Sequence, residues 1–229
     1  NAVGDLNEQL VLAKAGVLAS PEARQAFAAC IDIAAVAEES ARASGVDVKP
    51  MGTRLTTADD PINQQTEHIG AAHLGVDIPR AEMLRGQTIR VGYIAPNSRK
   101  AAMVEKMRAS CQPAGVNVVD ASGDAGTIQD LAVDRKQDNG TTQFDPRKLD
   151  AVLVAMDPNS QFGDVNATSG DVEALRQGEE RLWVDVPTIP LAAQPHTFVV
   201  DRTITNVVVN TSLSGIGWNM DRWQESRKK

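Results

Sequence analysis

The residues best placed to contact a ligand follow a short apolar run, Ala151–Met156. A run without polar residues is typical of a central strand that is buried on both faces. Ligands of open α/β sheets bind beyond the carboxyl ends of the strands, so Met156, Asp157 and Asn159 are candidate ligand-binding residues. The Asp157 carboxylate could pair with a cation or accept hydrogen bonds from hydroxyl groups. The alternative is an aspartate that starts a turn before Pro158.

A second candidate segment follows an alternating apolar pattern at Thr88–Ile94, which predicts another strand. Asn97 and Arg99 come shortly after this pattern and can reach a cleft at the same edge of the sheet. For Arg99 the alternative is a solvated position at the start of the next helix. Asn97 and Arg99 therefore complete the predicted set of ligand-binding residues.

The sequence lacks the common motifs of catalysis, phosphate binding and metal binding. It contains no G-x-S-x-G, Walker A or G-x-G-x-x-G pattern and no H-E-x-x-H motif. His68 and His73 are separated by a spacing that does not place them on one helical face. Gly123–Gly126 lacks a third glycine and a Lys-Ser/Thr pair, and so indicates a plain turn. We expect no catalytic residues, no metal site and no cofactor.

The overall charge and hydropathy exclude several kinds of partner. The net charge is −7 and the pI is about 5.0, so no basic face is available for nucleic acid. No apolar run approaches the ~20 residues that span a bilayer. We expect membrane attachment only through a signal or lipid anchor upstream of Asn1. Aromatic residues make up 3% of the chain, so the core must be largely aliphatic, which suits α/β packing.

The remaining patterns predict alternating helices and strands. These are a helix from Ser20 to about Arg42, a helix at Lys100–Cys111, a strand at Val116–Val119, a short helix at Thr127–Val133, a helix from Asp171 to about Val184, and late strands at Phe198–Val200 and Val207–Val209. Prolines and glycines divide residues 46–86 into loops and short helical pieces. The strand, helix and strand between residues 88 and 119 predict a parallel crossover.

The two cysteines, Cys30 and Cys111, fall on apolar positions of predicted helices. Neither belongs to a C-x-x-C motif or has a histidine at metal-ligand spacing, which argues against zinc. Two readings remain open: a pair of buried thiols, or one disulfide that joins two helices.

Three segments, in this order, resemble the family 5 extracellular solute-binding proteins, which are the oligopeptide- and dipeptide-binding type. They are Gly16–Asp32 (GVLASPEARQAFAACID), Leu182–Leu191 (LWVDVPTIPL) and Gly217–Trp223 (GWNMDRW). The resemblance implies an α/β fold, the C-terminal lobe of a two-lobed periplasmic-binding-protein-like (class II) architecture. Residues 1–200 would form this lobe, and residues 201–229 would return toward the N-terminal lobe.

The resemblance also implies a function. Members of this family are exported, non-enzymatic clamps, often lipid-anchored, that hold ligand between their lobes. The composition resembles that of mycobacterial lipoproteins linked to phosphatidylinositol mannoside and lipoarabinomannan biosynthesis. A glycolipid precursor or a peptide is the expected ligand, and a membrane mannosyltransferase or an ABC permease is the expected partner. The alternative from another class is a small α/β hydrolase or transferase. In peptide binders of this family, aromatic residues follow the strand that corresponds to Ala151–Met156. Here Asp157-Pro158 follows this strand without those aromatic residues.

Overall fold

The computed structural model describes residues 2–58, 60–126, 135–136, 142–143, 148–158, 172–196, 200–208 and 216–225. The strands are β1 (Ala2–Leu12), β2 (Thr88–Gly92), β3 (Asn117–Asp120), β4 (Arg135–Lys136), β5 (Thr142–Gln143), β6 (Ala151–Met156), β7 (Thr188–His196), β8 (Ile204–Thr205) and β9 (Gln224–Glu225). The α-helices are α1 (Pro21–Cys30), α2 (Ile33–Ser44), α3 (Asn63–Ala71), α4 (Ile78–Ala81), α5 (Ser98–Cys111) and α7 (Val172–Asp185). Short 3₁₀ turns lie at Gly16–Leu18, Glu82–Leu84, Gln112–Ala114 and Ile216–Arg222.

A five-stranded mixed sheet organises the chain, with strand order β3-β2-β6-β1-β7. Strand β2 is parallel to both β3 and β6, whereas β1 is antiparallel to both β6 and β7. The predicted α/β class and the predicted parallel pairing of the strands around α5 are confirmed. Strand β6 has the predicted bounds and occupies the centre of the sheet.

Strand β1 was not anticipated from the sequence. Its middle residues Asn7, Glu8 and Gln9 are polar, yet all three are fully buried. Because side chains alternate along a strand, Glu8 and Leu10 face the helices α2 and α5. Asn7 and Gln9 face the other way and bond with Thr56 and Thr188. Buried hydrogen bonds, not apolar alternation, hold this strand in place.

The predicted single helix from Ser20 to Arg42 is wrong: the structure has two helices there. Ile31 leaves the helical region, with φ −87° and ψ 118°, and its side chain is fully buried. The Asp32 carboxylate then accepts a hydrogen bond from the Ala35 N–H and starts α2 as an N-cap. The local capping signal of Asp32 outweighs the continuing apolar periodicity.

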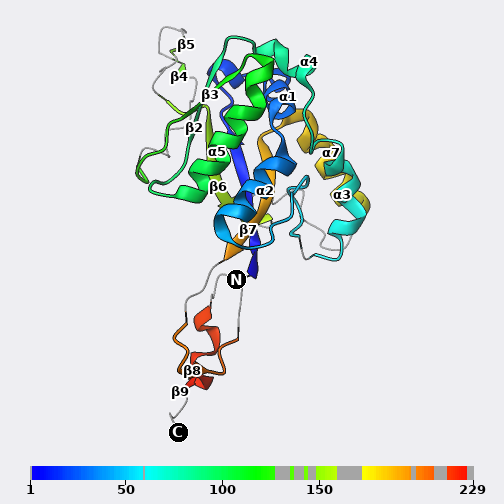
Figure 1. Ribbon diagram of the computed structural model, residues 1–229. Coiled ribbons are helices and arrows are strands. Elements are labelled where there is room, and N and C mark those ends of the chain that lie inside the picture. The colour runs from blue at the N-terminus through cyan, green and yellow to red at the C-terminus, as the bar shows by residue number, and fades with distance from the viewer. Residues whose placement is uncertain are drawn as a thin grey trace.

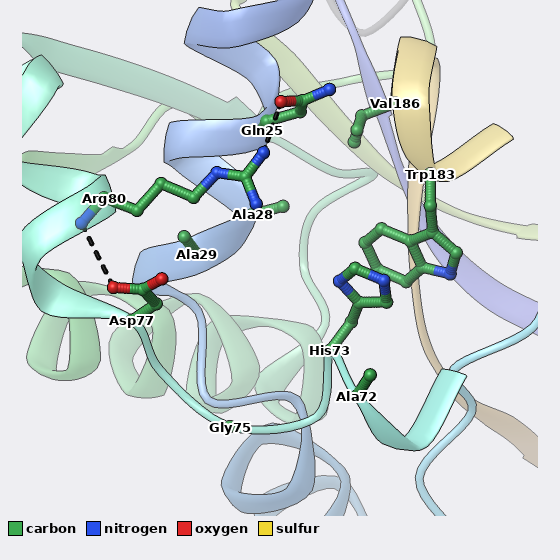
Figure 2. Close-up of a pocket in the computed structure, with 10 residues that line it drawn as sticks. All are labelled: Gln25, Ala28, Ala29, Ala72, His73, Gly75, Asp77, Arg80, Trp183 and Val186. Carbon is green, nitrogen blue, oxygen red and sulfur yellow. Dashed lines mark hydrogen bonds between the residues drawn. The ribbon is translucent and has the colours of Figure 1, made fainter. Parts of the chain in front are cut away.

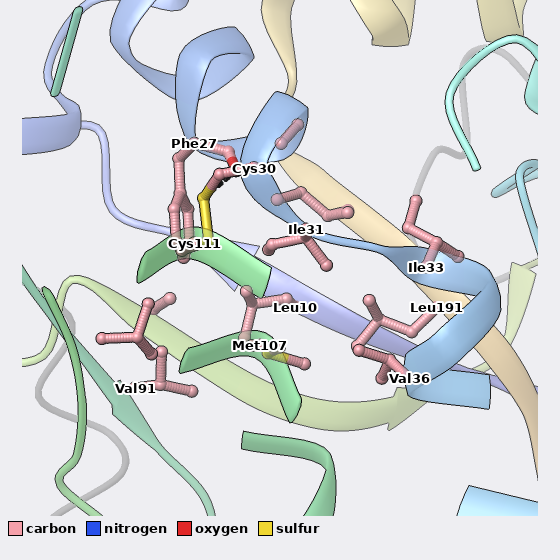
Figure 3. Close-up of a cluster of buried hydrophobic side chains, with 14 of the residues drawn as sticks. Leu10, Phe27, Cys30, Ile31, Ile33, Val36, Val91, Met107, Cys111 and Leu191 are labelled. Carbon is pink, nitrogen blue, oxygen red and sulfur yellow. Dashed lines mark hydrogen bonds between the residues drawn. A yellow bond between two sulfur atoms is a disulfide. The ribbon is translucent and has the colours of Figure 1, made fainter. Parts of the chain in front are cut away.

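Helices α1, α2 and α5 cover one side of the sheet (Figure 1). Their apolar side chains form the core with the central strands, as Phe27, Ile31, Met107, Leu10 and Leu191 show in Figure 3. Each of these five side chains is fully buried. The core is built almost wholly from aliphatic residues, as the low aromatic content predicts.

A disulfide joins the last residues of α1 and α5, between Cys30 and Cys111 (Figure 3). The two Cα atoms are 4.6 Å apart, and both residues are fully buried. Of the two readings that the sequence leaves open, the disulfide is the one that the structure shows. It locks two helices of the same layer together.

The C-terminal strands β8 and β9 pair with each other and lie apart from the main sheet (Figure 1). The predicted strand at Val207–Val209 is wrong for Val207 and Val208, which lie outside any strand. Asn206 has a φ of 63°, in the left-handed region, and this turn ends β8 before the valines. Phe198, Val199 and the helix predicted at Thr127–Val133 lie outside the described residues.

The division of the chain at residue 200 stays a prediction. Among the helices that the structure describes, none is long and apolar enough to cross a membrane.

The disulfide leads to a first prediction about stability. It closes a loop with a sequence separation of 81, so its loss should lower the free energy of unfolding by on the order of 4 kcal/mol through the entropy of the unfolded chain. Urea denaturation of the Cys30→Ala/Cys111→Ala double variant measures this. A reducing agent should destabilise the wild type and leave the variant unchanged. Equal unfolding midpoints for both proteins would contradict the prediction.

A second prediction concerns the contact of α3 with the segment that precedes it. A Cβ on Gly70 would lie 2.4 Å from the backbone of Gly52, closer than folded proteins tolerate. We therefore expect Gly70→Ala to lower the free energy of unfolding by roughly 1–3 kcal/mol. Gly75→Ala is the matched control, because a Cβ there meets nothing within 4 Å. If thermal denaturation gives the same melting temperature for both variants, the close Gly52–Gly70 contact does not limit the packing of α3.

Candidate ligand-binding site

The order of the strands changes direction at the carboxyl ends of β2 and β6. From β2 the chain passes through α5 to β3 on one side, and then returns to β6 on the other side. Such a reversal of strand order is where open α/β sheets bind ligands. Strand β1 begins at this edge, because Asn7 pairs with Met156, and β7 ends there at His196. We call this the crevice edge.

The structure places Met156 and Asp157 at the crevice edge. Met156 is the last residue of β6, and Asp157 follows it directly with a half-buried side chain. Asn159 lies outside the described residues. The predicted position of Asp157 beyond a buried parallel strand is therefore confirmed, whereas its contact with a ligand stays a prediction.

Asn97 precedes α5 as its N-cap and Arg99 lies in the first turn of this helix, at the same edge. The Asn97 side chain caps this helix by accepting a hydrogen bond from the Lys100 N–H, at 3.0 Å. The Arg99 guanidinium donates to Glu8 Oε1 at 2.7 Å and to Ser40 Oγ at 3.0 Å, and 14% of its side chain is exposed. Asn97 thus caps α5 and Arg99 ties it to β1, and a direct contact of either side chain with ligand stays a prediction.

Other polar residues at this edge were missed from the sequence. The Lys100 ammonium donates to the carbonyl oxygen of Leu153 in β6, at 3.1 Å. Burial lowers the pKa of Lys100, although the nearby Glu8 carboxylate opposes this effect. The Tyr93 hydroxyl donates to the Asp120 carboxylate at 2.8 Å and so joins the ends of β2 and β3. The one feature of the sequence that could have indicated these residues is that polar side chains follow or end the apolar strand patterns.

The crevice edge also presents apolar surface. Ile94, just after β2, has 51% of its surface exposed, and Ala95 and Pro96 after it are exposed as well. A carboxylate and an apolar strip at one edge can hold an amphipathic or peptide-like molecule in one orientation. Within the described part of the chain, no three His, Cys, Asp or Glu residues gather in a way that could hold a metal ion.

A buried ion pair supports the opposite side of the sheet. The Arg54 and Glu179 side chains are 0% and 1% exposed, and Glu179 also accepts the backbone N–H groups of Arg54 and Leu55. Burial lowers the pKa of Arg54 to about 10, while the Glu179 charge acts in the other direction. Burial raises the pKa of Glu179. Arg54 also donates to the carbonyl oxygen of Thr188 at 2.6 Å, which joins the pair to β7.

Trp183 on α7 connects this ion pair to the end of α3. The Arg54 guanidinium lies 4.1 Å from the centroid of the indole. The His73 ring stacks on the indole with centroids 3.8 Å apart and planes inclined by 10°. The Trp183 N–H donates to the carbonyl oxygen of Gly52 at 3.0 Å. The prediction that Trp183 packs in the core is confirmed, whereas the stacked His73 was not foreseen.

Comparison with solved structures identifies the fold. The periplasmic EDTA-binding protein EppA matches 99% of this chain and 49% of its own, with a TM-score of 0.74 and 13% identity. NikZ of Campylobacter jejuni, solved with Ni(L-His), matches 97% of this chain and 52% of its own, with a TM-score of 0.69 and 12% identity. The oligopeptide-binding protein AppA of Bacillus subtilis, solved with a nonapeptide, matches 99% and 52%, with a TM-score of 0.67 and 8% identity.

The fold of this chain is therefore that of one lobe of these periplasmic binding proteins. In sequence the chain is similar to mycobacterial lipoproteins. An uncharacterized lipoprotein of Mycobacterium tuberculosis is 31% identical over 96% of this chain and 43% of its own length. An uncharacterized lipoprotein of Mycobacterium leprae is 31% identical over 94% of this chain and 44% of its own length. The chain thus spans less than half the length of these relatives. No protein-family model matches it.

These findings confirm the resemblance to solute-binding proteins and the assignment to a single lobe. The lipoprotein relatives and the periplasmic neighbours also agree with the extracytoplasmic location expected from the sequence. Neither the solved neighbours nor the curated relatives test the individual ligand-binding residues.

The stacked His73 makes a prediction about pH. Burial lowers the pKa of His73, and the charges of Arg54 and Arg80 lower it further. Neutral His73 therefore stabilises the fold above the unfolded-state pKa of about 6.5, and this contribution is lost as the pH falls below that value. The His73→Phe variant keeps the stacked ring, and phenylalanine cannot titrate. The free energy of unfolding of this variant should therefore fall less steeply than that of the wild type between about pH 7 and pH 5.

Urea denaturation across this pH range measures the effect. His68→Phe is the matched control, because His68 is exposed and lies in the adjacent α3. The same pH slope in wild type and His73→Phe would show that His73 is not the group responsible.

Proposed function

We propose that this chain is the ligand-binding lobe of an exported, non-enzymatic solute-binding lipoprotein, which captures its ligand at the crevice edge. The observation that carries the proposal is the fold match over 99% of the chain to about half of the binding protein EppA. A single lobe supplies one wall of a cleft, and a second lobe would close over the ligand. The Cys30–Cys111 disulfide supports a location in an oxidising compartment.

Asp157 is the proposed anchor for a cationic group of the ligand, such as the amino terminus of a peptide. Asp157 directly follows β6, at the carboxyl end of a buried strand, where open α/β sheets bind their ligands. A carboxylate at this position can form a charge-assisted hydrogen bond with a ligand cation. The nonapeptide bound to AppA supports a peptide ligand for this fold, and an ABC permease is the corresponding partner.

A glycolipid-related role is the second candidate. The sequence suggested a role like that of the mycobacterial lipoprotein LpqW, in phosphatidylinositol mannoside and lipoarabinomannan biosynthesis. The mycobacterial lipoprotein relatives and the exposed apolar strip at Ile94 favour it. In this role the ligand would be a glycolipid precursor and the partner a membrane mannosyltransferase. A small hydrolase or transferase, the alternative from another class, would instead show turnover that one point change abolishes.

Substitution of Asp157 tests the peptide proposal. We expect Asp157→Asn to weaken the binding of trialanine about tenfold or more, because a charge-assisted bond to the peptide ammonium is lost. Isothermal titration calorimetry measures the affinity. N-acetyl-trialanine, which lacks the ammonium, should bind wild type and variant equally weakly.

Asp47→Asn is the control for this test, since Asp47 is exposed in the loop after α2, away from β6. Unchanged trialanine affinity in Asp157→Asn would rule out the anchor. Binding of vesicles that contain phosphatidylinositol mannoside, without any binding of trialanine, would favour the glycolipid role instead.

A further inference from the structure

A small hollow lies between α1, α4 and the end of α7, away from the crevice edge. It has a volume of about 130 Å³, and Gln25, Asp77, Arg80, His73 and Trp183 lie around it (Figure 2). A single water needs roughly 10–15 Å³, so the hollow has room for a molecule of several heavy atoms. The small residues Ala28, Ala29, Ala72 and Gly75 leave this space free.

The hollow lies at the opposite edge of the sheet from the crevice. Val186, which lines it, comes just before β7, where Thr188 pairs with Val11 near the end of β1. The central strand β6 has six residues, and a strand rises ~3.3 Å per residue. The two edges are therefore about 20 Å apart along β6. A ligand in this hollow cannot touch a ligand at the crevice edge.

Two exposed side chains of opposite charge, Asp77 and Arg80, line the rim of the hollow. Asp77 Oδ1 accepts the backbone N–H of Arg80 at 3.1 Å, and Oδ2 has no hydrogen-bond partner in the described part of the chain. The Arg80 guanidinium donates from Nη2 to Gln25 Oε1, which leaves Nε and Nη1 without acceptors among the described residues. One side of the hollow thus offers an acceptor with negative charge and another side offers donors with positive charge.

His73 completes the arrangement. Its ring stacks flat on Trp183, so its orientation is fixed, and one ring nitrogen points into the hollow toward the rim (Figure 2). The other face of the indole is taken by Arg54, so Trp183 itself has no free face to stack on a ligand. An aromatic ligand is therefore disfavoured, and a small polar one is favoured.

We propose that this hollow is a second ligand site, separate from the crevice edge, for a small zwitterion of the α-amino-acid class. The ligand carboxylate pairs with the Arg80 guanidinium, the ligand ammonium pairs with Asp77 Oδ2, and His73 bonds to the polar group nearest to it. An anion alone would face the Asp77 carboxylate, and a cation alone would face Arg80. Only a molecule with both charges uses both sides of the rim.

Nuclear magnetic resonance titration with glycine tests the proposal. We expect glycine to shift the backbone amide signals of Ala29 and Gly75 and the indole N–H signal of Trp183. Acetate and methylammonium, which each carry one of the two charges, should bind at least about tenfold more weakly. Acetate that binds as tightly as glycine, or glycine that shifts none of the three signals, would overturn the proposal.

Asp77→Asn is the decisive variant, because asparagine still caps α4 while the charge is removed. We expect its glycine affinity to fall about tenfold or more, with an unchanged melting temperature. Arg80→Gln should have the same effect, and Arg85→Gln is the matched control, since Arg85 pairs with the exposed Glu82 outside the hollow. Unchanged glycine affinity in Asp77→Asn would overturn the assignment, whatever binds at the crevice edge.

Discussion

The buried ion pair between Arg54 and Glu179 is the constraint on which one whole side of this lobe depends. Neither charge is in contact with solvent, so each must be compensated inside the protein. Glu179 does this by accepting two backbone N–H groups, and Arg54 by donating to β7 and lying over Trp183. The pair thereby fixes α7, the edge strand and the segment between α2 and α3 in one arrangement. The stacked ring of His73 and the small hollow beside it exist because Trp183 is held in this position.

The other side of the sheet is held by different forces. An aliphatic core, the Cys30–Cys111 disulfide and the buried contact of Arg99 with Glu8 fix α1, α2 and α5. The last of these contacts sets the position of the first turn of α5 at the crevice edge. Side chains that the sequence suggests as ligand contacts, Asn97 and Arg99, thus shape the edge by supporting the helix.

The two edges of the sheet have different chemical character, and this agrees with a division of roles. The crevice edge carries the acidic residue Asp157 and exposed apolar surface at Ile94. It lies where the chain leaves β2 toward β3 on one side and later returns to β6 on the other. In the proposed clamp, this edge is the wall that a second lobe would face. The opposite edge carries a small hollow with both charges on its rim. Because the two sites share no residue, substitutions in one can be interpreted without reference to the other.

The sequence by itself determined the local elements and the class of fold. The apolar run of β6, the helix that ends at Cys111 and the motif-like segments near Phe27 and Pro187 were enough to predict an α/β lobe of a solute-binding protein. Tertiary structure decided the rest. Strand β1 is invisible to hydrophobic periodicity because its buried centre is polar, and its partners Thr56 and Thr188 are 49 and 179 residues away. Arg54 and Glu179 are 125 residues apart, and neither residue type signals burial. Periodicity and capping act over a few residues, whereas compensation of a buried charge depends on groups that only the folded chain brings together.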